Sequence, residues 1–311
     1  MLDPRIAVLD AINLDESRVE YCSSHIVLLC GGRAPEKNNP DDPDPPTSSL
    51  RHALVTNPKN QIEFFKPEDV TNWQVDAAFK NLIDLEVELA AICSLVVIIL
   101  ESPGAIAELG AFSQLEEFNS KIVAICSQGH FHNDSFIKLG IFRHIKSFKE
   151  SAIKSYPWQT TSPPSIAEEI IDDVVYDVQD ELNKLPKTKT FKKNNNCHVF
   201  VLICELIALF VALKETEILE YLAQLGIVVS KEKLRGKLFL LERFQLIKAE
   251  TYSDSLFYLA KHNYHRVSFA TYASHPIDKL RIQVDCSEYY KDTSKHNHRS
   301  RAIRRLNGTQ K

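Results

Sequence analysis

The 311-residue chain has little of what marks a fibrous, disordered or low-complexity protein. It holds 9 glycines, 14 prolines and a single methionine, against 44% hydrophobic and 25% charged residues. Collagen-like and low-complexity chains are rich in glycine and proline, and disordered chains are poor in apolar residues. The composition therefore excludes all three classes, and the length is comfortable for two globular domains.

The seven cysteines contain no CxxC pair, so they predict neither a disulfide framework nor a zinc site. Most of them lie in apolar runs, where a reduced thiol acts as a small hydrophobe: Cys30, Cys93, Cys126 and Cys204. No His, Cys and carboxylate spacing indicates a metal site either. The start, MLDPRIAVLD, lacks the basic and apolar regions of a signal peptide, so we expect a cytoplasmic protein.

One apolar run, Cys197 to Leu213, comes close to the length of a membrane span. Its 17 residues are short of the roughly 20 that a bilayer needs, and Glu205 lies at its centre. A charge at that depth would be costly in lipid. The run predicts the buried first helix of a domain.

The net charge of −4 hides an uneven distribution along the chain. Residues 1–155 hold 14 Lys and Arg against 22 Asp and Glu, and residues 156–185 hold one Lys against seven acids. Residues 186–311 reverse the balance, with 22 Lys and Arg against 12 acids. An acidic front and a basic back indicate two tasks, one of which is contact with a polyanion.

The front of the chain alternates apolar runs with helical patterns. Buried parallel strands are predicted at 25–32, 95–100 and 121–126, and helices at 70–93 and 105–118. Residues 33–51 are dense in Pro, Asp, Asn and Ser, so they predict a long mobile loop. Strand and helix in this order predict an α/β fold with a parallel sheet, over residues 1–155.

Polar and proline-rich segments flank one acidic helix at 166–185, so residues 156–196 are predicted to be a linker. The order helix, helix, helix, hairpin over 197–275 is that of a winged helix-turn-helix domain, with Ser230 capping its third helix. The basic remainder, 276–311, is poor in apolar residues, and we expect it to order only on a partner.

The stretch Leu95–Phe112 (LVVIILESPGAIAELGAF) carries the strongest chemical signal. Open α/β sheets bind ligands at the carboxyl ends of their strands, which is where this strand meets the next helix. Ser102 is placed to cap that helix, Pro103 suits its first position, and Gly104 permits close approach of a ligand. Glu108 follows one and a half turns into the helix, where its carboxylate could stabilise or attack a sugar cation. Spacing alone equally allows a solvated helix glutamate.

Four further positions are singled out by their place in the sequence. The Gly31-Gly32-Arg33 segment ends the first strand, where backbone N–H groups and the Arg33 cation could hold a phosphate; an ordinary turn is the alternative. Trp73 could stack on a base or nicotinamide ring, or pack in a core. Glu101 is interpreted as a structural hydrogen-bond acceptor, and Asp69 as a helix cap.

The string Ala107-Glu108-Leu109-Gly110-Ala111, after its strand and before KIVAIC, resembles the signature of nucleoside 2-deoxyribosyltransferases over residues 20–150. The resemblance implies a flavodoxin-like domain with Glu108 as nucleophile. The positional candidates that we expect around the substrate are Gly31, Gly32, Arg33, Ser102, Pro103, Gly104 and Trp73. That family usually has an aspartate six residues before the glutamate to handle the departing base. This chain has Ser102 at that position, so it lacks the aspartate on which base exchange in that family relies.

The whole chain, with its glycosyl-transfer-like front and winged-helix back, resembles the effector subunits of bacterial retron anti-phage systems. The resemblance implies a toxin that hydrolyses NAD as its substrate, with no bound cofactor. It also implies control by a reverse transcriptase and its RNA–DNA hybrid (msDNA), and a higher-order oligomer. Exchange or hydrolysis of nucleosides by the same site is an alternative.

The basic back half supplies candidate phosphate contacts on its third helix and in its tail. The residues are Lys233, Arg235, Lys237, Arg299, Arg301, Arg304 and Arg305. A winged helix also suits a DNA-binding regulator whose front half senses a nucleotide without turnover. Few cations lie on the third helix and more in the tail, which favours docking on a structured RNA or hybrid through phosphates.

Overall fold

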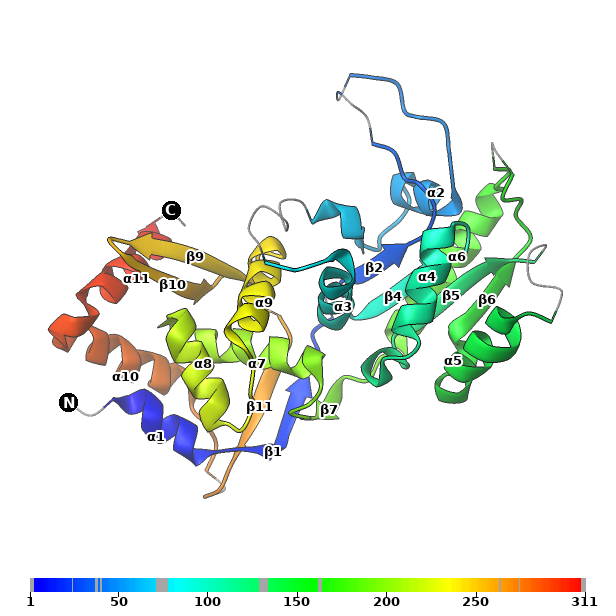
Figure 1. Ribbon diagram of the computed structural model, residues 1–311. Helices are drawn as coiled ribbons and strands as arrows, with labels where there is room; N and C mark the ends of the chain where they lie inside the picture. Colours follow the sequence, from blue (N-terminus) through cyan, green and yellow to red (C-terminus); the bar gives the residue numbers. More distant parts are fainter. Residues whose placement is uncertain are drawn as a thin grey trace. The chain divides into compact units, whose positions relative to one another are not determined.

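The computed structural model (Figure 1) describes residues 3–23, 25–36, 39, 41–70, 78–128, 134–161, 164–262, 264–273 and 275–308. Its contacts divide the chain into two compact units. The first, here the sheet unit, comprises His25–Thr71 and Leu89–Leu185. The second, the helical unit, comprises Met1–Ser24, Asn72–Glu88 and Pro186–Lys311.

The sheet unit is built on five parallel strands in the order β3-β2-β4-β5-β6. Their bounds are Phe64–Phe65 for β3, Val27–Cys30 for β2, Leu95–Ile99 for β4, Ile122–Ser127 for β5 and Ile153–Tyr156 for β6. Every residue of β2, β4 and β5 is buried, as expected for strands covered by helices on both faces. The predicted α/β class and parallel sheet are confirmed.

Numbered along the unit, the strand order is 2-1-3-4-5, the flavodoxin-like order of doubly wound sheets. The chain leaves β2 toward one side of the sheet for β3 and then crosses to the other side for β4. In such sheets ligands bind outside the carboxyl ends of the two strands where the order reverses. That place lies between β2 and β4.

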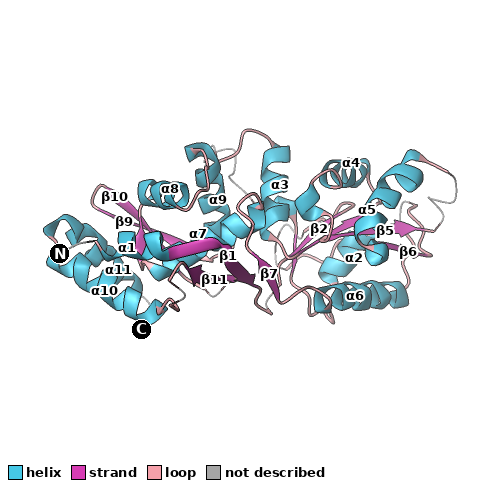
Figure 2. Ribbon diagram, turned by 90° about the horizontal axis from the view of Figure 1, so that it is seen from below, coloured by secondary structure: helices cyan, strands magenta, loops and turns pink. Residues whose placement is uncertain are grey.

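Helices cover both faces of this sheet (Figure 2). On one face, α2 (Leu50–Thr56) and α6 (Glu168–Asn183) pack on the apolar side chains of β2, β4 and β5 in a single core. The opposite face carries α4 (Pro103–Phe112), which follows β4 directly. Next to α4 is α5 (Arg143–Phe148), where His144 Nε2 lies 3.0 Å from the Ser113 carbonyl oxygen.

The acidic helix α6 is part of the sheet unit, which corrects the linker predicted over 156–196. Val174 and Val178 are fully buried against the sheet, and Trp158 just before the helix is 3% exposed. A hydrophobic stripe behind the acidic face drives this packing. Residues 186–196 belong to the helical unit, where β7 (Thr188–Thr190) pairs with β1 (Ile12–Glu20).

The helical unit contains two three-stranded antiparallel sheets among its described residues. The first has the order β11-β1-β7, so residues 1–24 pack here and not with the sheet as predicted. The second has the order β8-β10-β9. The further elements are α1 (Pro4–Ala11), α7 (Asn196–Leu209), β8 (Ala212–Leu213), α8 (Glu215–Gln224), α9 (Lys231–Arg243), β9 (Ile247–Tyr252), β10 (Ser255–Ala260) and β11 (Arg266–Thr271).

The predicted helices of this unit form near their expected places. The apolar run from Cys197 becomes α7, buried along most of its length. Ser230 caps α9 by accepting from the backbone N–H of Lys233 at 3.2 Å. In the part of the chain that is described, no helix is long and apolar enough to cross a membrane.

The C-terminal segment is helical, which corrects the expectation that residues 276–311 order only on a partner. It forms α10 (Lys279–Asp292) and α11 (Asn297–Gly308). Cys286, Tyr290 and Ala302 are fully buried, so a few apolar side chains at helical spacing fix the segment to its unit.

Two further differences concern the predicted helix at 70–93 and the short helices. The predicted helix is realised as α3 (Leu82–Ile92), while residues 71–77 lie outside the described part. The short helical turns are η1 (Pro67–Asp69), η2 (Glu116–Phe118), η3 (Ile137–Phe142), η4 (Glu150–Ala152) and η5 (Ser294–His296). Of these, η3 is π-helical and runs directly into α5.

Candidate functional site

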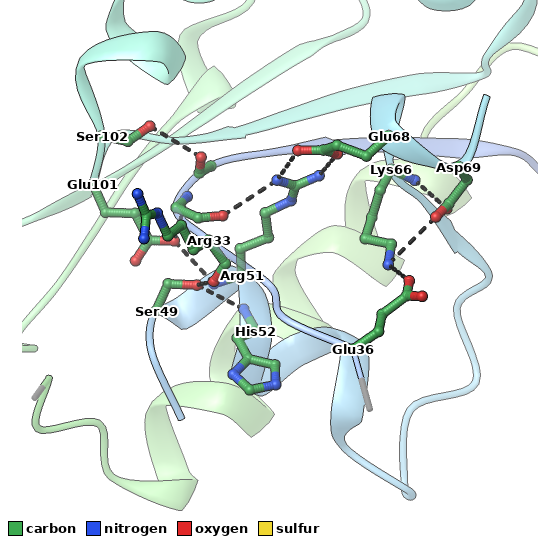
Figure 3. A network of polar contacts seen from close by, with 12 residues as sticks. Arg33, Glu36, Ser49, Arg51, His52, Lys66, Glu68, Asp69, Glu101 and Ser102 are labelled. Carbon is green, nitrogen blue, oxygen red and sulfur yellow. Dashed lines mark hydrogen bonds and ion pairs between the residues drawn. The ribbon is translucent and has the colours of Figure 1, made fainter. Parts of the chain in front are cut away.

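Glu101, directly after β4, is the centre of the polar contacts at the carboxyl edge of the sheet (Figure 3). Its Oε1 accepts from the backbone N–H groups of Gly32 and Arg51, each at 3.0 Å. Its Oε2 accepts from the backbone N–H of Leu50 at 2.8 Å. The carboxylate thus satisfies free N–H groups at the start of α2 and ties that helix to β2 and β4. This is the structural role expected of Glu101.

The two glycines after β2 allow this close approach. A Cβ on Gly32 would lie 2.7 Å from the Ser49 Cβ, and one on Gly31 would lie 3.1 Å from the Arg51 Cβ. The prediction that the backbone of Gly31 and Gly32 cradles a phosphate is corrected at Gly32. Its N–H is already donated to Glu101, and the residue is buried.

The start of α4 is formed as predicted. Ser102 Oγ accepts from the Ala105 N–H at 3.2 Å and donates to the Gly31 carbonyl at 3.0 Å, which links the ends of β4 and β2. Pro103 occupies the first turn. Gly104 is exposed, and a Cβ there would touch only Ser102 Oγ, at 3.9 Å. A side chain at position 104 would therefore meet no steric obstacle.

Glu108, in the middle of α4, is partly buried at this same edge. Its Oε2 is buried without a hydrogen-bond partner. Burial raises the pKa of the carboxyl above its ordinary value, and repulsion from Glu68 adds to that rise. A hydrogen bond from the Cys30 thiol and the nearby Arg51 cation oppose it. The carboxylate therefore keeps one buried oxygen whose capacity to accept a hydrogen bond is unused.

Arg51, on α2, is the cation whose charge lowers the pKa of this carboxyl. Its side chain is 4% exposed, and its guanidinium pairs with both carboxylate oxygens of Glu68, at 3.0 and 2.5 Å. Nη1 also donates to the Gly32 carbonyl at 3.2 Å, while Nε is buried without a partner. Burial opposes the charge of Arg51, yet the Glu68 contacts raise its pKa overall. It stays a cation.

The two ends of the segment between β2 and α2 are held together, at Arg33 on one side and at Ser48 and Ser49 on the other. Ser48 Oγ and Ser49 Oγ both donate to the Arg33 carbonyl at 2.7 Å. Farther along, the Nζ of Lys66 pairs with Glu36 and lies 3.3 Å from Asp69 (Figure 3). Asp69 Oδ2 accepts from the Lys66 N–H at 2.9 Å, which agrees with its expected role as a cap. The mouth of the loop thus has a defined geometry.

The structure brings most of the predicted substrate residues to one edge. Ser102 donates to the Gly31 carbonyl, Gly32 donates its N–H to Glu101, and the Arg33 side chain is exposed beside them. Trp73 lies outside the described residues. Sequence reasoning missed Cys30, Arg51 and Glu68. Only Cys30 had a signal, as the last residue of a buried strand; nothing in the local pattern of the other two indicates a buried ion pair.

The basic residues predicted to bind nucleic acid separate into exposed and buried groups. Arg301, Arg304 and Arg305 are exposed on α11. Arg301 donates to the Tyr252 hydroxyl at 2.8 Å, and Arg305 lies over the Tyr252 ring, so both lie beside strand β9. On α9, Lys233 and Arg235 are also exposed. Arg235 Nε donates to Glu215 at 2.9 Å.

Two of those predictions are corrected. Lys237 is 3% exposed, pairs with Glu88 at 2.7 Å and lies 4.2 Å from the Phe200 ring centroid. Arg299 is 2% exposed and donates to Glu217 at 2.5 Å. Both cations face the interior of the helical unit, so neither can reach a phosphate. A count of charges cannot tell an exposed cation from one committed to a buried partner.

No cluster of three His, Cys, Asp or Glu side chains within the described ranges could hold a metal ion. The candidate chemistry at this edge is that of a carboxylate, a buried cation and a capped helix start.

Comparisons with known proteins agree with a retron origin. Curated relatives include two Escherichia coli proteins, each named a candidate ribosyltransferase/DNA-binding protein, of retrons Ec86 and Ec73. The Ec86 protein is 30% identical over 130 residues, which cover 41% of this chain and 39% of the relative. The Ec73 protein is 28% identical over 125 residues, 38% of this chain and 37% of the relative.

These alignments span well under half of the length of either relative. The family comparison reaches farther. A profile described as STM3845 retron effector protein matches residues 47–249, close to two thirds of the chain, including Arg51, Glu101 and Glu108. The chain therefore belongs to the STM3845 retron effector protein family.

Proposed function

We propose that the sheet unit cleaves the N-glycosidic bond of a nucleotide, namely the nicotinamide–ribose bond of NAD, with Glu108 acting on the sugar. The observation that carries the proposal is the carboxylate of Glu108, whose buried Oε2 has no hydrogen-bond partner at the ligand-binding edge of a 2-1-3-4-5 sheet. The names of the two relatives, which include ribosyl transfer, support the same class of reaction.

The chemistry fits the residues present. As the bond between C1′ and the ring nitrogen breaks, its electron pair goes to the nitrogen and neutralises the pyridinium charge. Nicotinamide leaves as a neutral molecule, so no acid has to protonate it. Serine at position 102, where the deoxyribosyltransferases that the chain resembles usually have aspartate, is compatible with such a leaving group.

Glu108 would stabilise the ribosyl cation or form a covalent ester with C1′. Water then attacks C1′ and loses a proton to solvent. Where the ester has formed, its C1′–O bond breaks and the Glu108 carboxylate is regenerated, and ADP-ribose is released. Arg51 keeps a positive charge close to Glu108, which favours the ionised carboxylate that either role requires.

For the helical unit, we propose docking on the retron reverse transcriptase and its RNA–DNA hybrid. The order α7, β8, α8, α9, β9, β10, with β8 on the edge of the hairpin sheet, supports a winged helix-turn-helix as part of this proposal. The exposed arginines of α11 lie against β9 and add cations to the hairpin side. The DNA-binding part of the relatives' names supports this division of tasks.

The proposal is tested by incubating the purified protein, with and without its reverse transcriptase and hybrid, with NAD and a panel of nucleosides. We expect nicotinamide and ADP-ribose from NAD. Release of a free base from nucleosides, with NAD intact, would replace NAD hydrolysis by nucleoside cleavage. Operator DNA binding with no turnover of any substrate would support a nucleotide-sensing regulator instead.

An enzyme that drains NAD has to be restrained in a growing cell. Expression of the chain alone should therefore lower cellular NAD and slow growth, whereas the complete operon should do so only under phage challenge. Constant NAD in every combination would exclude NAD as the substrate.

A further inference from the structure

A pocket of the sheet unit lies at the carboxyl ends of β5 and β6. Its volume is about 470 Å³, within the usual range for small-molecule sites. Ser127 and Gln128 line it from the end of β5, and Ser155 lines it from β6. Neither Glu108 nor Arg51 is among its lining residues in the described chain. The pocket therefore lies apart from the proposed catalytic carboxylate.

Among the described residues that line this pocket are three cations and one carboxylate. The cations are Lys138, Arg143 and Lys146, and the acid is Asp134. The Lys138 ammonium lies 3.7 Å from Asp134, and the Lys146 ammonium lies 3.5 Å from Glu150. All four of these paired side chains are more than 40% exposed, so the two ion pairs are weak. An anionic ligand could replace the carboxylate in either pair. The pocket thus has an excess of positive charge.

The local backbone brings these cations to one face. They lie on η3 and the helix α5 that continues it. Lys138 lies within the π-helical segment, and Arg143, the first residue of α5, donates its backbone N–H to the Gly140 carbonyl. Lys146, three residues after Arg143, lies on the same side of α5 as Arg143. All three side chains line the one pocket. π-Helical turns are rare in proteins, and those that occur are often found at functional sites.

The same pocket offers an apolar wall. Leu139, Phe142 and Ile153 line it beside the cations. A ligand that combines an anionic group with a flat, weakly polar ring would satisfy both parts. The guanidinium of Arg143 can grip two phosphate oxygens at once, and the two lysines add point charges.

We propose that this pocket binds the phosphate of a nucleoside monophosphate, with the base against the apolar wall, at a site separate from Glu108. The pocket is lined from the neighbouring parallel strands β5 and β6, away from the point between β2 and β4 where the strand order reverses. The site would let the protein sense a nucleotide independently of the bond it cleaves.

The test measures AMP binding to the full chain carrying Glu108→Gln, so that turnover cannot consume the ligand. Calorimetric titrations are run with AMP, adenosine and inorganic phosphate. We expect AMP to bind more tightly than either fragment. The double variant Arg143→Gln/Lys146→Gln should raise the Kd for AMP at least tenfold. Arg143→Lys, which keeps the charge but loses the two-pronged grip, should fall between.

The matched control is Lys59→Gln/Lys184→Gln, which removes two exposed, carboxylate-paired lysines from the same unit. It should leave the Kd for AMP unchanged. Both double variants should keep the unfolding midpoint of their parent, because all four side chains are on the surface.

Absence of AMP binding by the parent, or an unchanged Kd in the Arg143→Gln/Lys146→Gln variant, would overturn the proposal. Competitive displacement of AMP by saturating NAD would also overturn it, since the pocket would then belong to the substrate site. Failure of NAD hydrolysis would leave the result unaffected, because binding is read without turnover.

Discussion

At the scale of single residues, the carboxylate of Glu108 is the proposed catalytic group, and its burial in the charged form lowers the free energy of unfolding. Its pKa lies above the ordinary value because burial disfavours the charged form. Above that raised pKa the group is ionised in both the folded and the unfolded protein, and only the folded protein bears the cost. Below the ordinary pKa both forms are protonated and the cost disappears.

Glu108→Gln is therefore expected to raise the free energy of unfolding at pH 7, and the gain should vanish as the pH falls through the raised pKa toward 4. Denaturant titrations of both proteins at several pH values measure the difference. A variant less stable than the wild type at pH 7 would show that the carboxylate has a structural role.

The acid limb of the pH–rate profile reports how neighbours set the ionisation of Glu108. Arg51 lowers the pKa of this carboxyl and Glu68 raises it. Arg51→Gln should move the limb to higher pH, whereas Glu68→Gln should move it to lower pH. Arg51→Lys, which preserves the charge, should return the limb toward its wild-type position. Shifts of the same sign in Arg51→Gln and Glu68→Gln would show that both act through packing alone.

At the scale of elements, the two glycines and Glu101 join β2, β4 and α2. Gly32→Ala should lower the free energy of unfolding by about 1–3 kcal/mol, because its Cβ would lie 2.7 Å from that of Ser49. Gly110→Ala, on α4, meets no atom within 4 Å and should be neutral or stabilising by up to about 1 kcal/mol. Thermal unfolding compares the two, and equal effects would mean that α2 can move away from β2.

Glu101→Gln removes the charge that holds the N–H groups of Gly32, Leu50 and Arg51. We expect a loss of about 1–3 kcal/mol of unfolding free energy. The exposed Glu116→Gln should stay within about 0.5 kcal/mol of the wild type. A neutral Glu101→Gln would mean that the start of α2 is satisfied in another way.

The elements also show where sequence reasoning succeeds. Strands β4 and β5 form within a residue of their predicted ends, because uninterrupted apolar runs have few alternatives to a buried strand. Strand β1 was missed, since it pairs with β7 and β11, almost 170 and 250 residues later. Glu108 and Ser102 could be foreseen from a local motif, whereas the Arg51–Glu68 pair arises only when α2 and η1 meet in the folded chain.

At the scale of the whole molecule, the acidic and basic halves of the sequence correspond only in part to the two units. Residues 1–24 and 72–88 join the basic C-terminal part, and some of its cations neutralise those segments, as Lys237 does with Glu88. The exposed remainder, including the arginines of α11, is what a nucleic acid could contact.

Replacing Arg301, Arg304 and Arg305 with Ala should lower the slope of log K against log salt for an RNA–DNA hybrid by about 3, one for each phosphate that is no longer neutralised. Lys237→Met should leave the slope unchanged and destabilise the fold by about 3 kcal/mol, because it leaves Glu88 without its cation. Binding measured across a salt titration separates the two. An unchanged slope in the triple variant would move the docking surface to α9.

The most direct test of the central claim compares nicotinamide release from NAD by the wild-type complex and by its Glu108→Gln counterpart. The substitution keeps the size of the side chain and removes the carboxylate, so partner binding should be equal in the two preparations. We predict release by the wild type and a loss of at least a thousandfold in the variant. A variant that keeps more than about a tenth of the wild-type rate would contradict the assignment of Glu108 as the group that acts on the sugar.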